Sequence, residues 1–86
     1  MRVKLQIKLD KVLKDRGMTQ LDLARLIDED REKRGIEKRV RTASISELYN
    51  NQRKSLNKEL IEEIASVLDI ADIDKLIDFK DVKASE

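Results

Sequence analysis

Basic side chains are concentrated between residues 31 and 41, a stretch with six cationic and two anionic residues. The six are Arg31, Lys33, Arg34, Lys38, Arg39 and Arg41, and the net charge of the stretch is +4. Cations at this density can neutralise the phosphates of a nucleic acid, and each neutralised phosphate adds salt-dependent affinity. A solvated, flexible surface loop is the alternative explanation. The stretch lies between two expected helices, and this position favours phosphate binding.

Residues for covalent or acid–base catalysis are scarce. The chain contains no His, no Cys and one Tyr, so the usual pairs of nucleophile and base cannot be assembled. The many carboxylates follow amphipathic helix patterns that solvent exposure explains. The lack of Cys also excludes disulfides and thiolate metal sites. We therefore expect no enzyme, no metal site and no cofactor.

Size and composition predict one small helical domain. The chain has 86 residues, of which 43% are charged and 40% hydrophobic, with no Pro and two Gly. Only Tyr49 and Phe79 are aromatic, so an aliphatic core must do the packing. Many charges and few helix breakers favour helices at a length that supports a single core. No apolar run is long enough to cross a membrane, so we expect a cytoplasmic protein without membrane contacts.

The net charge of +1 hides an uneven distribution. Residues 1–58 carry a net charge of +7, whereas residues 59–86 carry −6. A basic body with an acidic end fits a surface that binds a polyanion. Uneven charge is also common in helical proteins, so it does not by itself identify a nucleic-acid partner.

The first residues alternate between polar and apolar side chains from Arg2 to Leu9. This period of two is typical of a half-buried strand. From Leu9 the spacing becomes helical, and Gly17 follows where a left-handed cap is wanted, which predicts a helix over residues 8–16. The segment before it is an edge strand, a wing, a continuation of the helix or an extended start packed on its own core. A strand there could pair with a second copy and give a homodimer.

Thr19 and Asp22 predict the start of the second helix. They form a capping box in which Asp replaces the usual Glu or Gln. An apolar stripe runs from Leu23 to Ile27. The charged residues up to Arg34 could prolong the helix by one or two turns, with Gly35 as its natural stop.

Three more helices are expected after the charged stretch. They cover residues 42–50, 57–68 and 72–79, and residues 80–86 are expected to form a frayed polar tail. The first of them starts near Thr42, although Ser44 with Glu47 makes an alternative capping box. Asn50 and Asn51 end it, because Asn tolerates the left-handed conformation.

Four short motifs follow one another over residues 8–79. They are Arg16-Gly17-Met18-Thr19-Gln20, Leu23-Ala24, Ile45-Ser46-Glu47-Leu48-Tyr49-Asn50-Asn51, and the basic Gln52-Arg53-Lys54 followed by the aliphatic segment Leu60–Leu68. In this order the chain resembles the Cro-like, lambda-repressor-like helix-turn-helix domains of the XRE family. The resemblance implies an all-α, compact five-helix domain spanning residues 1–86, with a possible short N-terminal strand and residues 42–50 as the recognition helix.

The chain departs from the family's pattern in two places. The family joins its two central helices by a tight turn with Gly, whereas Asp28 stands here. About a dozen extra residues precede Val40, which would be the family's apolar turn residue. We therefore expect a long charged insertion over residues 28–40. Glu47 stands where many relatives place Arg, Gln or Lys. Glu can accept a hydrogen bond from cytosine, but phosphate repels it.

The resemblance implies roles for individual residues in binding double-stranded DNA. Base edges in the major groove would face Thr42, Ala43, Ser46 and Glu47. Phosphates or flanking DNA would be contacted by Gln20, Lys38, Arg39, Gln52, Arg53 and Lys54. Arg41, at the start of the recognition helix, could reach a guanine or a phosphate. Without the resemblance, local capping would explain the hydroxyl side chains, and Gln20 would be a plain surface residue.

Members of this family commonly act as repressors that bind palindromic operators as homodimers. The resemblance therefore implies a small transcriptional regulator, a repressor of phage or prophage type, with DNA as partner and no small-molecule ligand. The alternative is a protein-binding accessory module on the same scaffold. It would contact another regulator through the charged segment 28–41.

Overall fold

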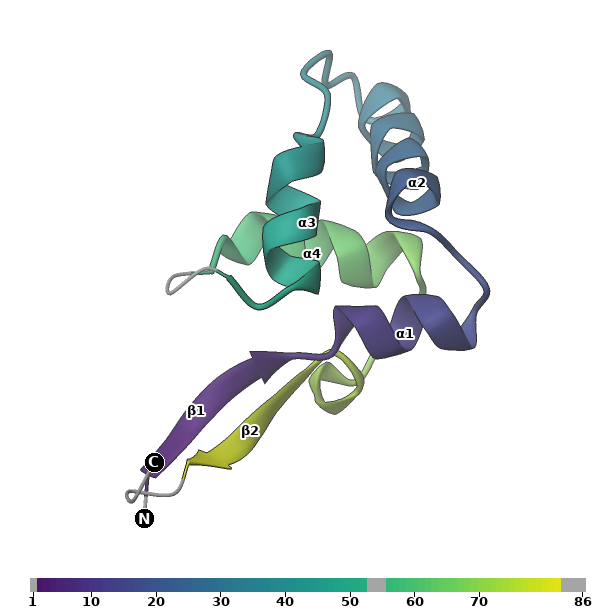
Figure 1. Ribbon diagram of the computed structural model, residues 1–86. Coiled ribbons are helices and arrows are strands. Elements are labelled where there is room, and N and C mark those ends of the chain that lie inside the picture. The colour runs from purple at the N-terminus through teal and green to yellow at the C-terminus, as the bar shows by residue number, and fades with distance from the viewer. Residues whose placement is uncertain (1, 53–55, 83–86) are drawn as a thin grey trace.

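A computed structural model describes residues 2–52 and 56–82 of the chain (Figure 1). The elements, in chain order, are β1 (Arg2–Ile7), α1 (Leu9–Asp15), α2 (Gln20–Lys33), α3 (Thr42–Tyr49), α4 (Lys58–Val67), the 3-10 helix η1 (Ile73–Lys75) and β2 (Ile77–Val82). Over these residues, four α-helices make up a helical body, and β1 and β2 form a two-stranded ribbon that projects from it (Figure 1). None of the described helices is long and apolar enough to cross a membrane.

The predicted starts of α2 and α4 are confirmed by hydrogen bonds at their caps. The Thr19 hydroxyl accepts a hydrogen bond from the Asp22 N–H at 3.1 Å, and the Asp22 carboxylate accepts one from the Thr19 N–H at 3.0 Å. The Asn57 side chain likewise accepts from the Leu60 N–H at 3.2 Å. These bonds satisfy N–H groups that the first turn of a helix leaves unpaired. The start of α3 at Thr42 is also confirmed, and the alternative start at Ser44 is not used.

The charged segment is not the long insertion that the sequence led us to expect. Its first six residues, 28–33, belong to α2, which continues in register to Lys33. Gly35 then adopts a φ of +78°, which ends the helix. Only the connection of residues 34–41 separates α2 from α3. The helix can continue through these charged residues because their side chains lie in solvent or, like Arg31, form an ion pair with α4.

The prediction of an all-α, five-helix fold is wrong at its C-terminal end. In place of a helix over 72–79, the chain makes a single 3-10 turn and then enters β2. β2 pairs antiparallel with β1, and Ile77 lies opposite Ile7 while Phe79 lies opposite Leu5. Residues 80–82, expected in a frayed tail, are part of this strand, and residues 83–86 lie outside the described residues. The expectation of a short N-terminal strand is confirmed.

An aliphatic core joins the helices to the base of the ribbon. Its fully buried side chains are Leu9, Leu13, Leu23, Ile27, Ile45, Ile64, Leu68 and Leu76. Ile7 and Val40 are also buried, so the inner end of β1 and the end of the α2–α3 connection both belong to the core. Burial of Val40 confirms its predicted role as the apolar residue of the turn.

The amide side chain of Asn51 fixes β1 to the end of α3. Its Oδ1 accepts a hydrogen bond from the Ile7 N–H at 2.7 Å, and its Nδ2 donates one to the Ile7 carbonyl at 2.9 Å. The amide thus takes the place of a neighbouring strand beside Ile7. Asn51 also has a φ of +54°, which confirms the predicted left-handed end of this helix.

Candidate nucleic-acid interface

One side of α3 is packed and the other faces outward. Ile45 and Leu48 are buried against the body, with α2 as the main neighbour. With 100° between successive residues, positions 42, 43, 46, 47 and 50 fall within one arc of about 140° on the opposite side. Thr42, Ala43 and Asn50 are exposed there, while Ser46 and Glu47 are half-buried. The four predicted base-reading residues are therefore brought together on one face.

Asn50 belongs to this face, although the sequence predicts for it only a role in ending the helix. Its Nδ2 donates to the Ser46 carbonyl at 2.9 Å and to the Ser46 hydroxyl at 3.3 Å. These contacts orient the Ser46 hydroxyl as an acceptor and leave its proton available to a ligand. The spacing of four residues between Ser46 and Asn50 is the signal that could have identified it.

Two side chains of α2 hold the backbone of the α2–α3 connection. The Asp28 carboxylate accepts a hydrogen bond from the Val40 N–H at 2.8 Å. One turn further along α2, the Arg31 guanidinium donates to the Lys38 carbonyl at 3.1 Å. Together with the burial of Val40, these bonds fix the extended segment that leads into α3.

The anchored segment presents three cations beside the start of α3. Lys38, Arg39 and Arg41 are all exposed. Arg39 has a loose ion pair with Asp28, at 3.6 Å, and its side chain is 84% exposed. The positive end of the α3 dipole lies next to them. Both the dipole and the three cationic side chains would therefore attract a phosphate. The structure thus groups the three predicted phosphate contacts with the first turn of α3.

Arg31 and Arg34, part of the same cluster in the sequence, are bound to α4 instead. Arg31 forms two hydrogen bonds of 2.7 Å with Glu63, and Arg34 adds a third at 2.8 Å. Hydrogen bonding to Arg31 lowers the pKa of Glu63, and the same bonds raise the pKa of Arg31. These two cations stabilise the packing of α2 on α4. Carboxylates of the protein largely neutralise their charge, so little of it is left to attract DNA.

Gln20 lies at the opposite end of α2 from the cationic connection. It is the first residue of this helix, which rises about 20 Å over the thirteen steps from Gln20 to Lys33. Its side chain is half-buried. The capping box places the Asp22 carboxylate beside it, and the hydrogen bond from the Thr19 backbone lowers the pKa of Asp22. A phosphate at this helix end would therefore approach an ionised carboxylate.

The predicted contacts after α3 are described only in part. Gln52 is exposed, and its N–H donates to the Glu47 carbonyl at 2.9 Å. This bond fixes the backbone just after Asn51, the left-handed residue that ends α3. Arg53 and Lys54 lie outside the described residues.

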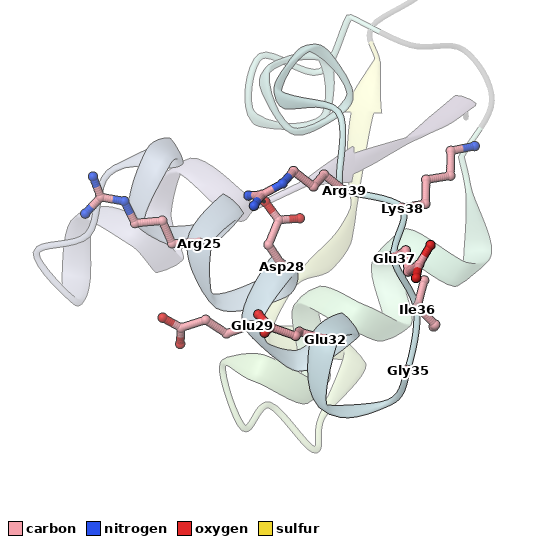
Figure 2. Close-up of a pocket in the computed structure, with 9 residues that line it drawn as sticks. All are labelled: Arg25, Asp28, Glu29, Glu32, Gly35, Ile36, Glu37, Lys38 and Arg39. Carbon is pink, nitrogen blue, oxygen red and sulfur yellow. Dashed lines mark ion pairs between the residues drawn. The ribbon is translucent and has the colours of Figure 1, made fainter.

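A shallow groove lies on the other side of the connection. Figure 2 shows Arg39 reaching toward Asp28 along one wall, while Lys38 points away. Four carboxylates line the groove, from Asp28, Glu29, Glu32 and Glu37. Three cations, Arg25, Lys38 and Arg39, line the same groove, so its charge is mixed with one carboxylate in excess.

Comparison with known families connects this geometry to a class of protein. Neither the curated proteins nor the solved structures gave a match to the chain. The family model of the Cro/C1-type HTH DNA-binding domain matches residues 8–81, which include all four α-helices and most of β2. The match covers both central helices, the connection between them and the candidate interface. The chain belongs to the family of Cro/C1-type helix-turn-helix DNA-binding domains.

Proposed function

We propose that the protein is a sequence-specific transcriptional regulator that inserts α3 into the major groove of double-stranded DNA. Thr42, Ala43, Ser46 and Glu47 would face base edges. Asn50 supports this reading because it orients Ser46 on the same face. By occupying an operator, such a protein would act as a repressor of the phage or prophage type, an assignment that rests on the family resemblance alone.

The observation that carries the proposal is the placement of three exposed cations at the start of α3. Lys38, Arg39 and Arg41 come from a segment whose backbone α2 holds at two points. Phosphate contacts fix the register of a protein on DNA, and side chains on the adjacent helix then read the bases. The anchored cationic segment would supply the phosphate contacts, and the exposed polar face of α3 would supply the base contacts. Gln52, Arg53 and Lys54 would add backbone contacts beyond the other end of α3, and Gln20 at the start of α2.

Titration of labelled DNA at two salt concentrations tests this proposal. The protein should bind duplex DNA, and its affinity should fall steeply as salt rises. Arg39→Ala and Arg41→Ala should each weaken binding to all sequences and reduce the slope of log K against log salt by about one. Lys75→Ala, on the exposed η1, is the matched control and should leave the slope unchanged. No measurable binding at low salt would contradict the proposal.

The groove over α2 supports a second candidate function. Its four carboxylates, Asp28 among them, outnumber its three cations and suit a basic segment of another protein better than a phosphate. The protein would then be an accessory module that docks another regulator on residues 28–41. Glu32→Gln with Glu37→Gln removes two of these charges without changing the shape of the groove. If this substitution abolishes binding to a basic regulator and leaves DNA affinity intact, the accessory function is supported; a gain in DNA affinity alone favours the first proposal.

A further inference from the structure

A recess beside α1 combines cationic side chains with an apolar floor. It has a volume of about 240 Å³, and one carboxylate, from Asp15, lies at its rim. The floor consists of Val12 and Ile70, both half-buried. Four cations complete the lining, which gives it a net charge of +3; they are Lys8, Lys11, Arg16 and Lys75. We call this site the α1 recess.

The fold forms the α1 recess by returning the chain to α1 after α4. Five of the lining residues come from one arc of about 140° along residues 8–16. The returning segment is fixed at both ends. Asp69 turns the chain with a φ of +56°, and the Lys8 N–H donates to the Leu76 carbonyl at 2.7 Å. These constraints hold Ile70 and Lys75 beside α1.

The cations of the α1 recess keep most of their charge. Lys11, Arg16 and Lys75 are exposed, and among the described residues they form no ion pair. Lys8 has one long ion pair, of 4.0 Å, with Asp78. Four cations around one small recess therefore remain available to an anionic partner.

The apolar floor restricts which anion fits. A phosphate would lose hydration against Val12 and Ile70, whereas an apolar side chain gains by burial there. The recess is smaller than the about 300–1,000 Å³ of pockets that enclose drug-sized ligands, so it suits a single side chain better than a cofactor. Its described lining offers no aromatic ring on which a base of a single strand could stack. A peptide supplies both an apolar side chain and carboxylates.

We propose that the α1 recess binds an acidic peptide segment of another protein. One aliphatic or aromatic side chain of the segment lies on Val12 and Ile70. Acidic residues on either side of it pair with Lys11 on α1 and with Lys75 on η1. Two walls of like charge thus select a segment that is acidic on both sides of its apolar anchor.

The position of the α1 recess keeps the docked segment away from α3. In Figure 1, η1 lies on the opposite side of α1 from α3. The segment would therefore leave α3 uncovered, and the protein could hold a partner while bound to DNA. This last step rests on the proposed function, whereas the docking itself does not.

Selection from a library of random dodecapeptides displayed on phage tests the proposal with the full chain and no DNA. The enriched peptides should place one aliphatic or aromatic residue between acidic residues. Fluorescence anisotropy then measures the dissociation constant of a labelled enriched peptide. Replacing its apolar residue by serine leaves the charge unchanged and should weaken binding by about tenfold or more.

Charge variants of the protein locate the site. Lys11→Glu should weaken binding of the enriched peptide by about tenfold at low salt, and Asp15→Asn should strengthen it about twofold. Lys14→Glu is the matched control, because Lys14 is exposed on the same helix but lies outside the recess. It should change the dissociation constant by less than about twofold. Circular dichroism verifies that each variant is folded.

A two-dimensional amide NMR spectrum of the isotope-labelled chain provides a second measurement. Addition of the enriched peptide should shift the amide signals of residues 8–16 and 70–76 most. The signals of α3 and of residues 38–41 should move little, because they lie outside the recess.

Five results would overturn the proposal. Selection might enrich no acidic peptide, or Lys11→Glu and Lys14→Glu could weaken binding equally. Peptides that bind as well with serine in place of the apolar residue would show a general anion-binding surface. Shifts centred on α3 would place the peptide elsewhere, and recess signals that move with protein concentration alone would assign the recess to a second copy. None of these measurements uses DNA, so the docking site and the proposed function can fail separately.

Discussion

The guanidinium of Arg31 and the carboxylate of Glu63 form a doubly hydrogen-bonded ion pair, with both N···O distances at 2.7 Å. The pair joins α2 to α4, and both side chains are largely shielded from solvent, at 16% and 12% exposed. Arg31 also donates to the Lys38 carbonyl. One arginine thus connects the packing of the helices to the position of the segment that leads into α3.

Glu63→Gln should lower the free energy of unfolding by about 2 kcal/mol, because it leaves the shielded Arg31 charge without its counter-ion. Glu62→Gln is the matched control. Glu62 pairs with Lys58 at 3.9 Å in an exposed position, where such pairs contribute about 0.5 kcal/mol or less. Urea denaturation with a common m-value measures both. Equal losses for the two variants would contradict the role assigned to the Arg31–Glu63 pair.

The same pair should make stability depend on pH. Hydrogen bonding to Arg31 lowers the pKa of Glu63 in the folded state. Its contribution is therefore fully present above the unfolded pKa of about 4.3 and is lost as pH falls through the lower, folded value. The difference in unfolding free energy between wild type and Glu63→Gln should be constant from pH 5 to 7 and shrink toward pH 2. A difference that grows on acidification would contradict this account.

Substitution of Asn51 by Ala should destabilise the fold more than substitution by Gly. Both substitutions remove the two hydrogen bonds to Ile7, at a cost of about 1–2 kcal/mol. Ala must also adopt the φ of +54°, which adds about 1 kcal/mol that Gly avoids. Thermal unfolding followed by circular dichroism should rank wild type above Asn51→Gly and Asn51→Ala last. The reverse order of the two variants would show that the backbone conformation does not matter there.

Asp28→Asn should strengthen DNA binding without loss of stability. The Asn side chain can still accept the Val40 N–H, so the connection stays anchored, but the negative charge beside Arg39 is gone. We expect about a two- to fivefold gain in affinity at low salt, which disappears at high salt. Asp74→Asn, on exposed η1, removes the same charge away from the interface and should change little. A loss of affinity in Asp28→Asn would mean that its charge is needed to position Arg39.

Local signals predicted most of the helical body. The capping box at Thr19 and the cap at Asn57 mark the starts of α2 and α4, and the left-handed Gly17 marks the end of α1. Each signal acts within a few residues, so these helix ends could be predicted from the sequence. The outward face of α3 also follows from periodicity once Ile45 and Leu48 are known to be buried. Asn50 could have been added by the same argument.

Long-range partners explain what the sequence did not predict. Ile77 and Phe79 fit an apolar helix face as well as an alternating strand, and their pairing partners in β1 lie some seventy residues earlier. The strand forms because β1 offers it a pairing partner, which the sequence of residues 72–82 does not indicate. In the same way, Arg31 and Arg34 resembled phosphate contacts until the fold placed Glu63, from α4, beside them.

The claim that α3 reads the DNA sequence is tested most directly by a specificity ratio. Wild-type protein is selected on a random duplex library, and its dissociation constant is measured for the enriched sequence and for unrelated DNA. The ratio should be at least about 10³. Thr42→Ala combined with Ser46→Ala should reduce it by tenfold or more, while binding to unrelated DNA and its salt dependence stay the same. Ser66→Ala, on the exposed side of α4, should leave the ratio unchanged. A wild-type ratio near one, or a ratio that survives the double substitution, would contradict the account.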